Sequence, residues 1–275
     1  MSRIDAHHHV WDLGLRAHTW LNPDKMAPVR RTFTLDQLEA SAAVTGVTQT
    51  VLVQVLPDLD ETKEFLDLAA GSDLVAGVVG WIDLTAPDAA ETLAALPAGL
   101  VAIRHGVQSE PDPAWLALPG VRRGLAAVAA AGLAYDLLTL PHQLPAAIDT
   151  AAAMPELTFV LDHLSKPPIA GGRLEPWRRL IRDLAAHPNV YCKLSGLVTE
   201  ADWASWKVAD LRPYAEIALE AFGPERVMFG SDWPVCLLAA DYGQVVAAAD
   251  ELCAGLSESE RADVFAGTAR RAYGL

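Results

Sequence analysis

The chain has 275 residues, of which 52% are hydrophobic and 20% charged, with a formal net charge of −14. This composition is typical of a globular protein and excludes wholesale disorder. The acidic balance, with no patch rich in Lys and Arg, argues against nucleic acid or an anionic membrane as a partner. No run reaches the roughly 18 uninterrupted apolar residues of a membrane span.

The cysteines and the N-terminal residues indicate the cellular compartment in which the protein is expected. The three cysteines share no metal-ligand spacing, and the first residues lack the apolar core of a signal peptide. We therefore expect reduced thiols and a cytoplasmic protein.

Short apolar runs alternate along the chain with alanine-rich stretches of helical period. Strands are predicted at 4–10, 49–55, 74–82, 100–107, 133–138, 157–162, 190–195 and 227–231. Helices are predicted at 35–44, 59–70, 88–96, 121–131, 144–153, 176–186, 213–222, 242–256 and 258–273, with Pro213 in a first turn, where proline is tolerated. Eight strand–helix units with nearly continuous apolar strands predict a parallel (β/α)8 TIM barrel, folded as a single domain over 1–275. An open doubly wound sheet is the alternative, but it would not bring the first strand beside the last.

Two histidines separated by one residue stand in the first predicted strand. Because side chains alternate along a strand, His7 and His9 are expected on one face and His8 on the other. Asp232 follows the last predicted strand, and it can reach the histidine pair only if the sheet closes into a ring. The alternatives are a tag remnant or a strand with structural histidines, and for Asp232 a helix N-cap.

The active site of such a barrel lies at the C-terminal ends of its strands, and nearly every predicted strand ends in a polar side chain. Candidate substrate-binding residues there are Gln54, Trp81, Arg104, His105, Gln108 and Trp233. Each has a plainer interpretation: Arg104 pairing with a carboxylate, for example, or the tryptophans only packing. Lys193 and His142 are expected to be solvated or structural, and His163 is either a site residue or a structural histidine.

Several segments in fixed order resemble one known family. They are the His7/His9 pair, DHLSKPP at 162–168, KLSGL at 193–197, FGSDWP at 229–234, and IRH at 103–105 followed by QSEPDP at 108–113. Together, over residues 4 to about 273, they resemble the amidohydrolase superfamily and, within it, the lactonase branch. That branch includes L-fuconolactonase and L-rhamnonolactonase types, sulfomuconolactonase and 2-pyrone-4,6-dicarboxylate lactonase.

The resemblance implies that His7, His9, His163 and Asp232 converge in one catalytic site. The superfamily commonly carries a metal-bridging lysine or glutamate on strand four, where this chain has Arg104 and His105. A two-metal centre is therefore not expected. One zinc or other divalent metal held by the four residues is one expectation, and metal-free catalysis is the other.

The expected reaction is the opening of a small lactone. Asp232 would act as general base on water, while the histidines or one zinc polarise the carbonyl. A dicarboxylate substrate would need several arginines, and the strand ends offer only Arg104, with Lys193 and Lys166 as helpers. A sugar aldonolactone is favoured for this reason, with L-fucono-, L-rhamnono- or L-galactono-lactone implied by the resemblance. A pyrone lactonase, a zinc-dependent decarboxylase, a non-catalytic sugar-acid-binding barrel and a homodimer remain open.

Overall fold

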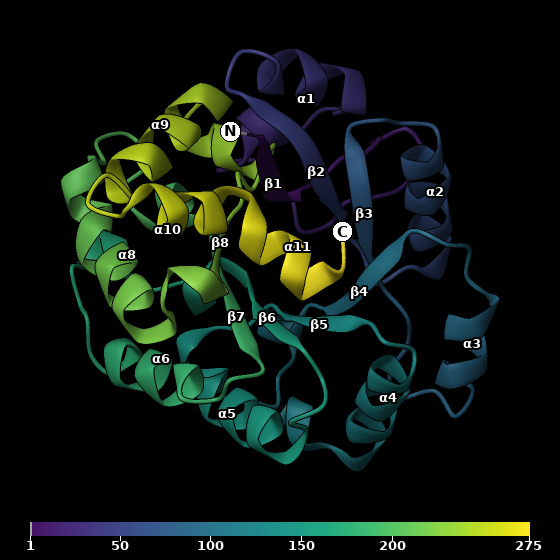
Figure 1. The fold of residues 1–275 in the computed structure, drawn as a ribbon. Helices are drawn as coiled ribbons and strands as arrows, with labels where there is room; N and C mark the ends of the chain where they lie inside the picture. Colours follow the sequence, from purple (N-terminus) through teal and green to yellow (C-terminus); the bar gives the residue numbers. More distant parts are fainter. Residues whose placement is uncertain (1) are drawn as a thin grey trace.

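The structure is a computed structural model, and it describes residues 2–275. Eight parallel strands lie side by side in chain order and helices surround them, which confirms the predicted (β/α)8 barrel (Figure 1). The strands are β1 (Arg3–His8), β2 (Val47–Val53), β3 (Val75–Gly80), β4 (Leu100–His105), β5 (Ala134–Leu137), β6 (Phe159–Leu161), β7 (Val190–Leu194) and β8 (Val227–Phe229).

The helices follow the strands in turn. They are α1 (Leu35–Ala42), α2 (Leu59–Ala70), α3 (Ala89–Ala95), α4 (Pro119–Ala130), α5 (Leu144–Ala153), α6 (Trp177–Ala185), α7 (Leu197–Glu200), α8 (Val208–Phe222), α9 (Tyr242–Leu252), α10 (Glu258–Ala262) and α11 (Thr268–Tyr273). Their apolar faces pack against the outer side chains of the strands in one large core.

Two helical predictions differ from the structure. Helix α8 begins at Val208 rather than at 213, so Pro213 lies inside it. The carboxylate of Asp210 accepts a hydrogen bond from the Lys207 backbone N–H at 2.8 Å, which caps the helix at the earlier position. The helix expected at 258–273 is divided by a π-helical turn at Asp263–Gly267.

The barrel closes just beyond the end of β8. The backbone N–H of His9 donates to the Trp233 carbonyl at 2.7 Å, and that of Asp232 donates to the His7 carbonyl at 2.8 Å. Below these bonds, the buried carboxylate of Asp5 accepts from Ser231 N–H at 2.8 Å and from the Tyr242 hydroxyl at 3.0 Å. Ring closure therefore brings residue 232 beside residues 7 and 9, as the sequence requires.

The opposite mouth of the barrel is covered by α11, which crosses the centre of the ring in Figure 1. Ala269, Ala272 and Tyr273 pack there against small and branched side chains from inside the strands, such as Ile4 and Val79. Since this mouth is filled, the barrel is open only at the C-terminal ends of its strands.

Candidate active site

A cavity of about 420 Å³ lies at the C-terminal ends of the strands. Its lining includes His9, Gln54, Arg104, His105, Gln108, Ser109, Glu110, His163, Lys166 and Asp232, with Trp20 and Met26 from the segment after β1. The predicted histidines and aspartate do meet: His9, His163 and Asp232 line the cavity and His7 lies fully buried next to them.

Four donor atoms converge at the floor of the cavity. His7 Nε2 and His9 Nε2 are 3.1 Å apart. Asp232 Oδ1 lies 3.5 Å from His9 Nε2, 3.8 Å from His7 Nε2 and 3.9 Å from His163 Nε2. Donors at about 2.1 Å from one tetrahedral zinc ion stand about 3.4 Å from one another. The donor atoms of His7, His9 and Asp232 all lie within 4.8 Å of one another and fit a single ion, whereas His163 falls in a separate group with His7 and Asp162.

Hydrogen bonds on the far side of each ring orient two of these imidazoles. His9 Nδ1 bonds the Val53 carbonyl at 2.7 Å, which places its proton on Nδ1 and leaves the Nε2 lone pair facing the cavity. His163 Nδ1 bonds the Ser195 hydroxyl at 2.8 Å. Such bonds hold the rings in the orientation that a metal or a polarised carbonyl requires.

Burial sets the charges of these groups. It lowers the pKa of His9, and it lowers the pKa of His163 to about 4, so both imidazoles are neutral at pH 7. Burial alone would raise the pKa of the Asp232 carboxyl, but the contacts with His163 and His9 hold that pKa below its ordinary value. The floor therefore combines neutral nitrogen donors with one ionised carboxylate.

Two of the four residues have a strained backbone. Residues 163–166 form a left-handed turn, with φ of 52°, 52°, 57° and 50°, and Asp232 has φ of 58°. A left-handed residue other than glycine costs about 1–2 kcal/mol, and such residues are normally single. The turn places both His163 and Lys166 at the cavity. Strained backbone of this kind is typically found at functional sites.

Beneath His7 lies a buried polar network that the sequence did not reveal. Lys193, expected to be solvated or structural, is fully buried, and its Nζ contacts Asp136 at 2.6 Å, Asp162 at 3.0 Å and His7 Nδ1 at 3.1 Å. The Tyr273 hydroxyl donates to Asp136 at 2.9 Å. The network connects the site to the helix at the closed mouth and fixes the ring of His7 from below.

Asp162 joins this network to Arg104. Arg104 Nη1 donates to Asp162 Oδ2 at 3.0 Å, its Nη2 donates to the Gln54 carbonyl, and Gln54 Nε2 donates to the Arg104 carbonyl at 3.0 Å. Lys193 and His7 hold the pKa of Asp162 well below its ordinary value, against the effect of burial. Gln54 Oε1 has no hydrogen-bond partner within the described chain, and Gln54 lines the cavity.

The other predicted substrate contacts occupy different positions. Gln108 and His105 line the cavity. Trp81 lies behind His105 and donates from Nε1 to His105 Nδ1 at 3.1 Å. Trp233 is buried with its ring edge-on to Phe33, 5.3 Å between centroids. The role of each residue in binding substrate stays a prediction.

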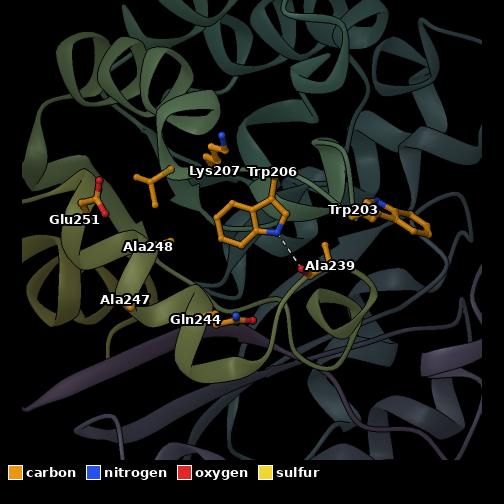
Figure 2. A pocket seen from close by; sticks show the side chains of 10 residues that line it. Trp203, Trp206, Lys207, Ala239, Gln244, Ala247, Ala248 and Glu251 are labelled. Carbon is orange, nitrogen blue, oxygen red and sulfur yellow. Dashed lines mark hydrogen bonds between the residues drawn. The ribbon is translucent and has the colours of Figure 1, made fainter.

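A second hollow of about 460 Å³ lies outside the barrel, between the loop after α7 and helix α9 (Figure 2). Trp206 occupies its centre and donates from Nε1 to the Ala239 carbonyl at 2.9 Å. Lys207 and Glu251 stand at its edge. None of the predicted site residues lines this hollow, so the chemistry belongs to the cavity at the strand ends.

Comparison with known proteins gives the family. The amidohydrolase family model matches residues 4–275. The chain belongs to the amidohydrolase family. An L-fucono-1,5-lactonase from Burkholderia ambifaria is 40% identical over 98% of this chain and 95% of its own length. The corresponding enzyme of Burkholderia multivorans is 39% identical over 99% and 96%. A crystal structure of an amidohydrolase from Burkholderia multivorans with bound zinc superposes with a TM-score of 0.96 at 38% identity, covering all of both chains.

The site of this amidohydrolase rests on a buried network whose role the sequence did not reveal. Asp162, Lys193 and Asp136 were visible as charged residues inside or at the end of apolar strands, where alternate side chains point into the barrel. Nothing in the sequence paired them with one another or with Tyr273.

Among residues 2–275, no helix combines the length and apolar character that crossing a membrane takes.

Proposed function

We propose that this amidohydrolase opens a neutral sugar lactone, with L-fucono-1,5-lactone as the first candidate and L-rhamnono- and L-galactono-lactone next. The observation that carries the proposal is the Asp232 carboxylate, which lies 3.5–3.9 Å from three imidazole nitrogens at the floor of a 420 Å³ cavity. The names of the two Burkholderia relatives support the same substrate class.

We also propose that His7, His9, His163 and Asp232 hold one zinc ion. The donor set is three imidazole nitrogens and one carboxylate oxygen, which is the chemistry that zinc prefers. His7 would present Nε2 to the ion, while its Nδ1 lies 3.3 Å from Asp162 Oδ1 and 3.1 Å from Lys193 Nζ on the far side of the ring. When bound, the ion would supply Lewis-acid polarisation of the carbonyl. Catalysis by the side chains without a metal is the alternative.

The chain's own residues account for the proton transfers. Asp232 accepts a proton from the attacking water at its carboxylate. As the tetrahedral intermediate collapses and the bond from carbonyl carbon to ring oxygen breaks, Asp232 returns that proton to the ring oxygen. His9 and His163 face the same carboxylate from two sides. The pKa of Asp232 lies below its ordinary value, so it meets the water as a carboxylate.

The charges of the cavity favour a neutral substrate over a dicarboxylate. Arg104 lines the cavity but is bound to Asp162 and to the Gln54 carbonyl. Lys166 is the one Lys or Arg of the lining with no ion-pair partner among the described residues, and Glu110 adds a negative charge to the wall. Two carboxylates of a pyrone substrate would need more free guanidinium groups than the cavity has.

The proposal is tested by purified protein on a panel of aldonolactones, pyrones and muconolactones, followed by acid release, together with metal analysis. In Asp232→Asn we expect kcat to fall by about 10²–10⁴-fold while the folded structure is retained. Asp241→Asn is the matched control, since Asn keeps the N-cap that Asp241 provides to α9 outside the cavity. An Asp232→Asn enzyme with near-normal turnover would overturn the assignment of the base.

Assays of carbon dioxide release and of aldonate binding, beside the lactone panel, separate the alternative functions. A zinc-dependent decarboxylase would release carbon dioxide from aromatic acids and lose all activity on chelation. A non-catalytic sugar-acid-binding barrel would bind aldonates and leave every lactone intact. We further propose a cytoplasmic location, since Cys192, Cys236 and Cys253 are all unpaired and buried. A homodimer stays a prediction, which light scattering of the purified protein tests.

A further inference from the structure

On the cavity wall, His105 uses both of its ring nitrogens within the protein. Trp81 Nε1 donates to His105 Nδ1 at 3.1 Å, and an indole N–H is a donor only. Nδ1 therefore carries the lone pair and the proton is on Nε2, which lies 2.7 Å from Glu110 Oε1. The His105 ring also stacks on Trp115, with 4.2 Å between centroids and 9° between planes. His105 thus has no free nitrogen for a substrate.

The residue that His105 presents to the cavity is Glu110. Its Oε1 accepts the His105 Nε2–H, and its Oε2 has no hydrogen-bond partner among residues 2–275. The side chain is 28% exposed and lines the same cavity as Asp232 and His163. Clamping of His105 by Trp81 and Trp115 gives Glu110 a fixed direction, which an unrestrained surface glutamate would not have.

A fixed carboxylate with one free oxygen recognises hydroxyl groups. A carboxylate only accepts hydrogen bonds, and a bond from a hydroxyl to a charged acceptor is about twice as strong as one between neutral groups. The same charge repels a carboxylate on the substrate. A ligand with an ester at one end and hydroxyls at the other matches a cavity with Asp232 at its floor and Glu110 on its wall.

We propose that Glu110 is the residue that selects polyhydroxylated lactone rings by binding their hydroxyl groups, and that His105 and Trp81 are positioning residues for it. The proposal rests on the lactone-opening function proposed above. It assigns substrate contact to Glu110, and it gives His105 and Trp81 roles behind that contact.

The test compares two rings that differ only in hydroxyl groups, a polyhydroxylated 1,5-lactone and δ-valerolactone. In Glu110→Ala we expect kcat/KM on the hydroxylated ring to fall about 10- to 100-fold, mainly through KM, since a hydrogen bond to a charged group is lost. On δ-valerolactone we expect a change of less than about threefold, because that ring makes no such bond. Inhibition constants of a polyhydroxylated 1,5-lactam and of 2-piperidinone give the same comparison without turnover.

Two further variants locate the effect. Trp81→Phe keeps an aromatic ring but removes the N–H that fixes the His105 tautomer. It should lower kcat/KM on the hydroxylated ring relative to δ-valerolactone, by a smaller factor than Glu110→Ala does. Asp112→Asn removes a carboxylate two residues from Glu110 that does not line the cavity, and it should change neither lactone.

An equal loss on both rings in Glu110→Ala, or no loss on the hydroxylated ring, overturns the Glu110 proposal and leaves the lactonase proposal standing. A wild-type protein that opens neither ring overturns the proposed function itself.

Discussion

Replacing Lys193 by Met should lower the stability of the folded barrel while keeping its interior packed. The side chain of Lys193 is fully buried, and its ammonium is 2.6 Å from Asp136 and 3.0 Å from Asp162. Met fills a similar volume, so the change removes the charge rather than the packing. After the change Asp162 keeps Arg104 at 3.0 Å, while Asp136 keeps only the neutral hydroxyl of Tyr273. Asp136 is therefore the group left without a countercharge.

The expected loss follows from this unpaired carboxylate. Removing one partner of a buried ion pair costs about 3–5 kcal/mol. An unfolding entropy of about 2.1 cal/mol/K per residue gives about 0.6 kcal/mol/K for the 275 residues. A loss of about 4 kcal/mol then lowers the Tm by about 7 °C.

Thermal and urea unfolding of a short mutant cycle measure this loss. The variants are Lys193→Met, Asp136→Leu and the double variant, in which neither charge is buried. The double variant should be more stable than Lys193→Met alone, because replacing both partners by apolar groups is often neutral. The control is Arg179→Met, which breaks an exposed pair with Asp183 at 3.2 Å and should cost less than about 1 kcal/mol.

Two results would refute this reasoning. One is a Lys193→Met protein within about 1 kcal/mol of the wild type, which would mean that Asp136 carries no charge that needs compensation. The other is a double variant that loses the sum of the two single losses, which would mean that the two side chains act independently.

Two other variants test local features of the barrel. Glu61 is buried and accepts from the Val55 and Leu56 backbone N–H groups, and burial raises its pKa from 4.5 to about 7. The folded state therefore binds this proton more tightly, and the wild type loses on the order of 3 kcal/mol of stability as the pH rises from about 4.5 through 7. Urea midpoints of Glu61→Gln should lack that loss, and parallel pH curves would contradict the assignment. Gly196 has φ of +67°, and a Cβ there would lie 2.7 Å from His163 Nδ1, so Gly196→Ala should lower kcat about 10- to 100-fold by displacing that ring. The control is Gly172→Ala, at φ of +60° with open space around the added methyl group, and it should lower only the Tm. If Gly172→Ala lowered kcat as much as Gly196→Ala, backbone strain rather than displacement of the His163 ring would explain both kcat losses.

Local patterns in the sequence were enough to predict the architecture and the faces of its strands. Apolar runs alternating with helical stretches predicted eight units, and the structure has eight parallel strands in chain order. Alternation along β1 put His7 and His9 on one face, and their Nε2 atoms lie 3.1 Å apart. His8 does not line the cavity, and its two ring nitrogens are buried without partners among the described residues. These features depend on neighbours in the chain, so a local pattern carries them.

The tertiary structure alone decided which charged groups meet. Lys193, Asp136 and Tyr273 come from β7, β5 and α11, and no local pattern relates residues 57 and 137 positions apart. The same holds for Trp81 and Glu110, which act on opposite sides of the His105 ring. The backbone strain at residues 163–166 is likewise invisible in the sequence, because it is imposed by contacts that form only in the closed barrel. The sequence by itself determined a barrel with a histidine pair and an aspartate at its open mouth. Ring closure and burial decided how those groups are charged, oriented and supported, because both depend on residues distant in the chain.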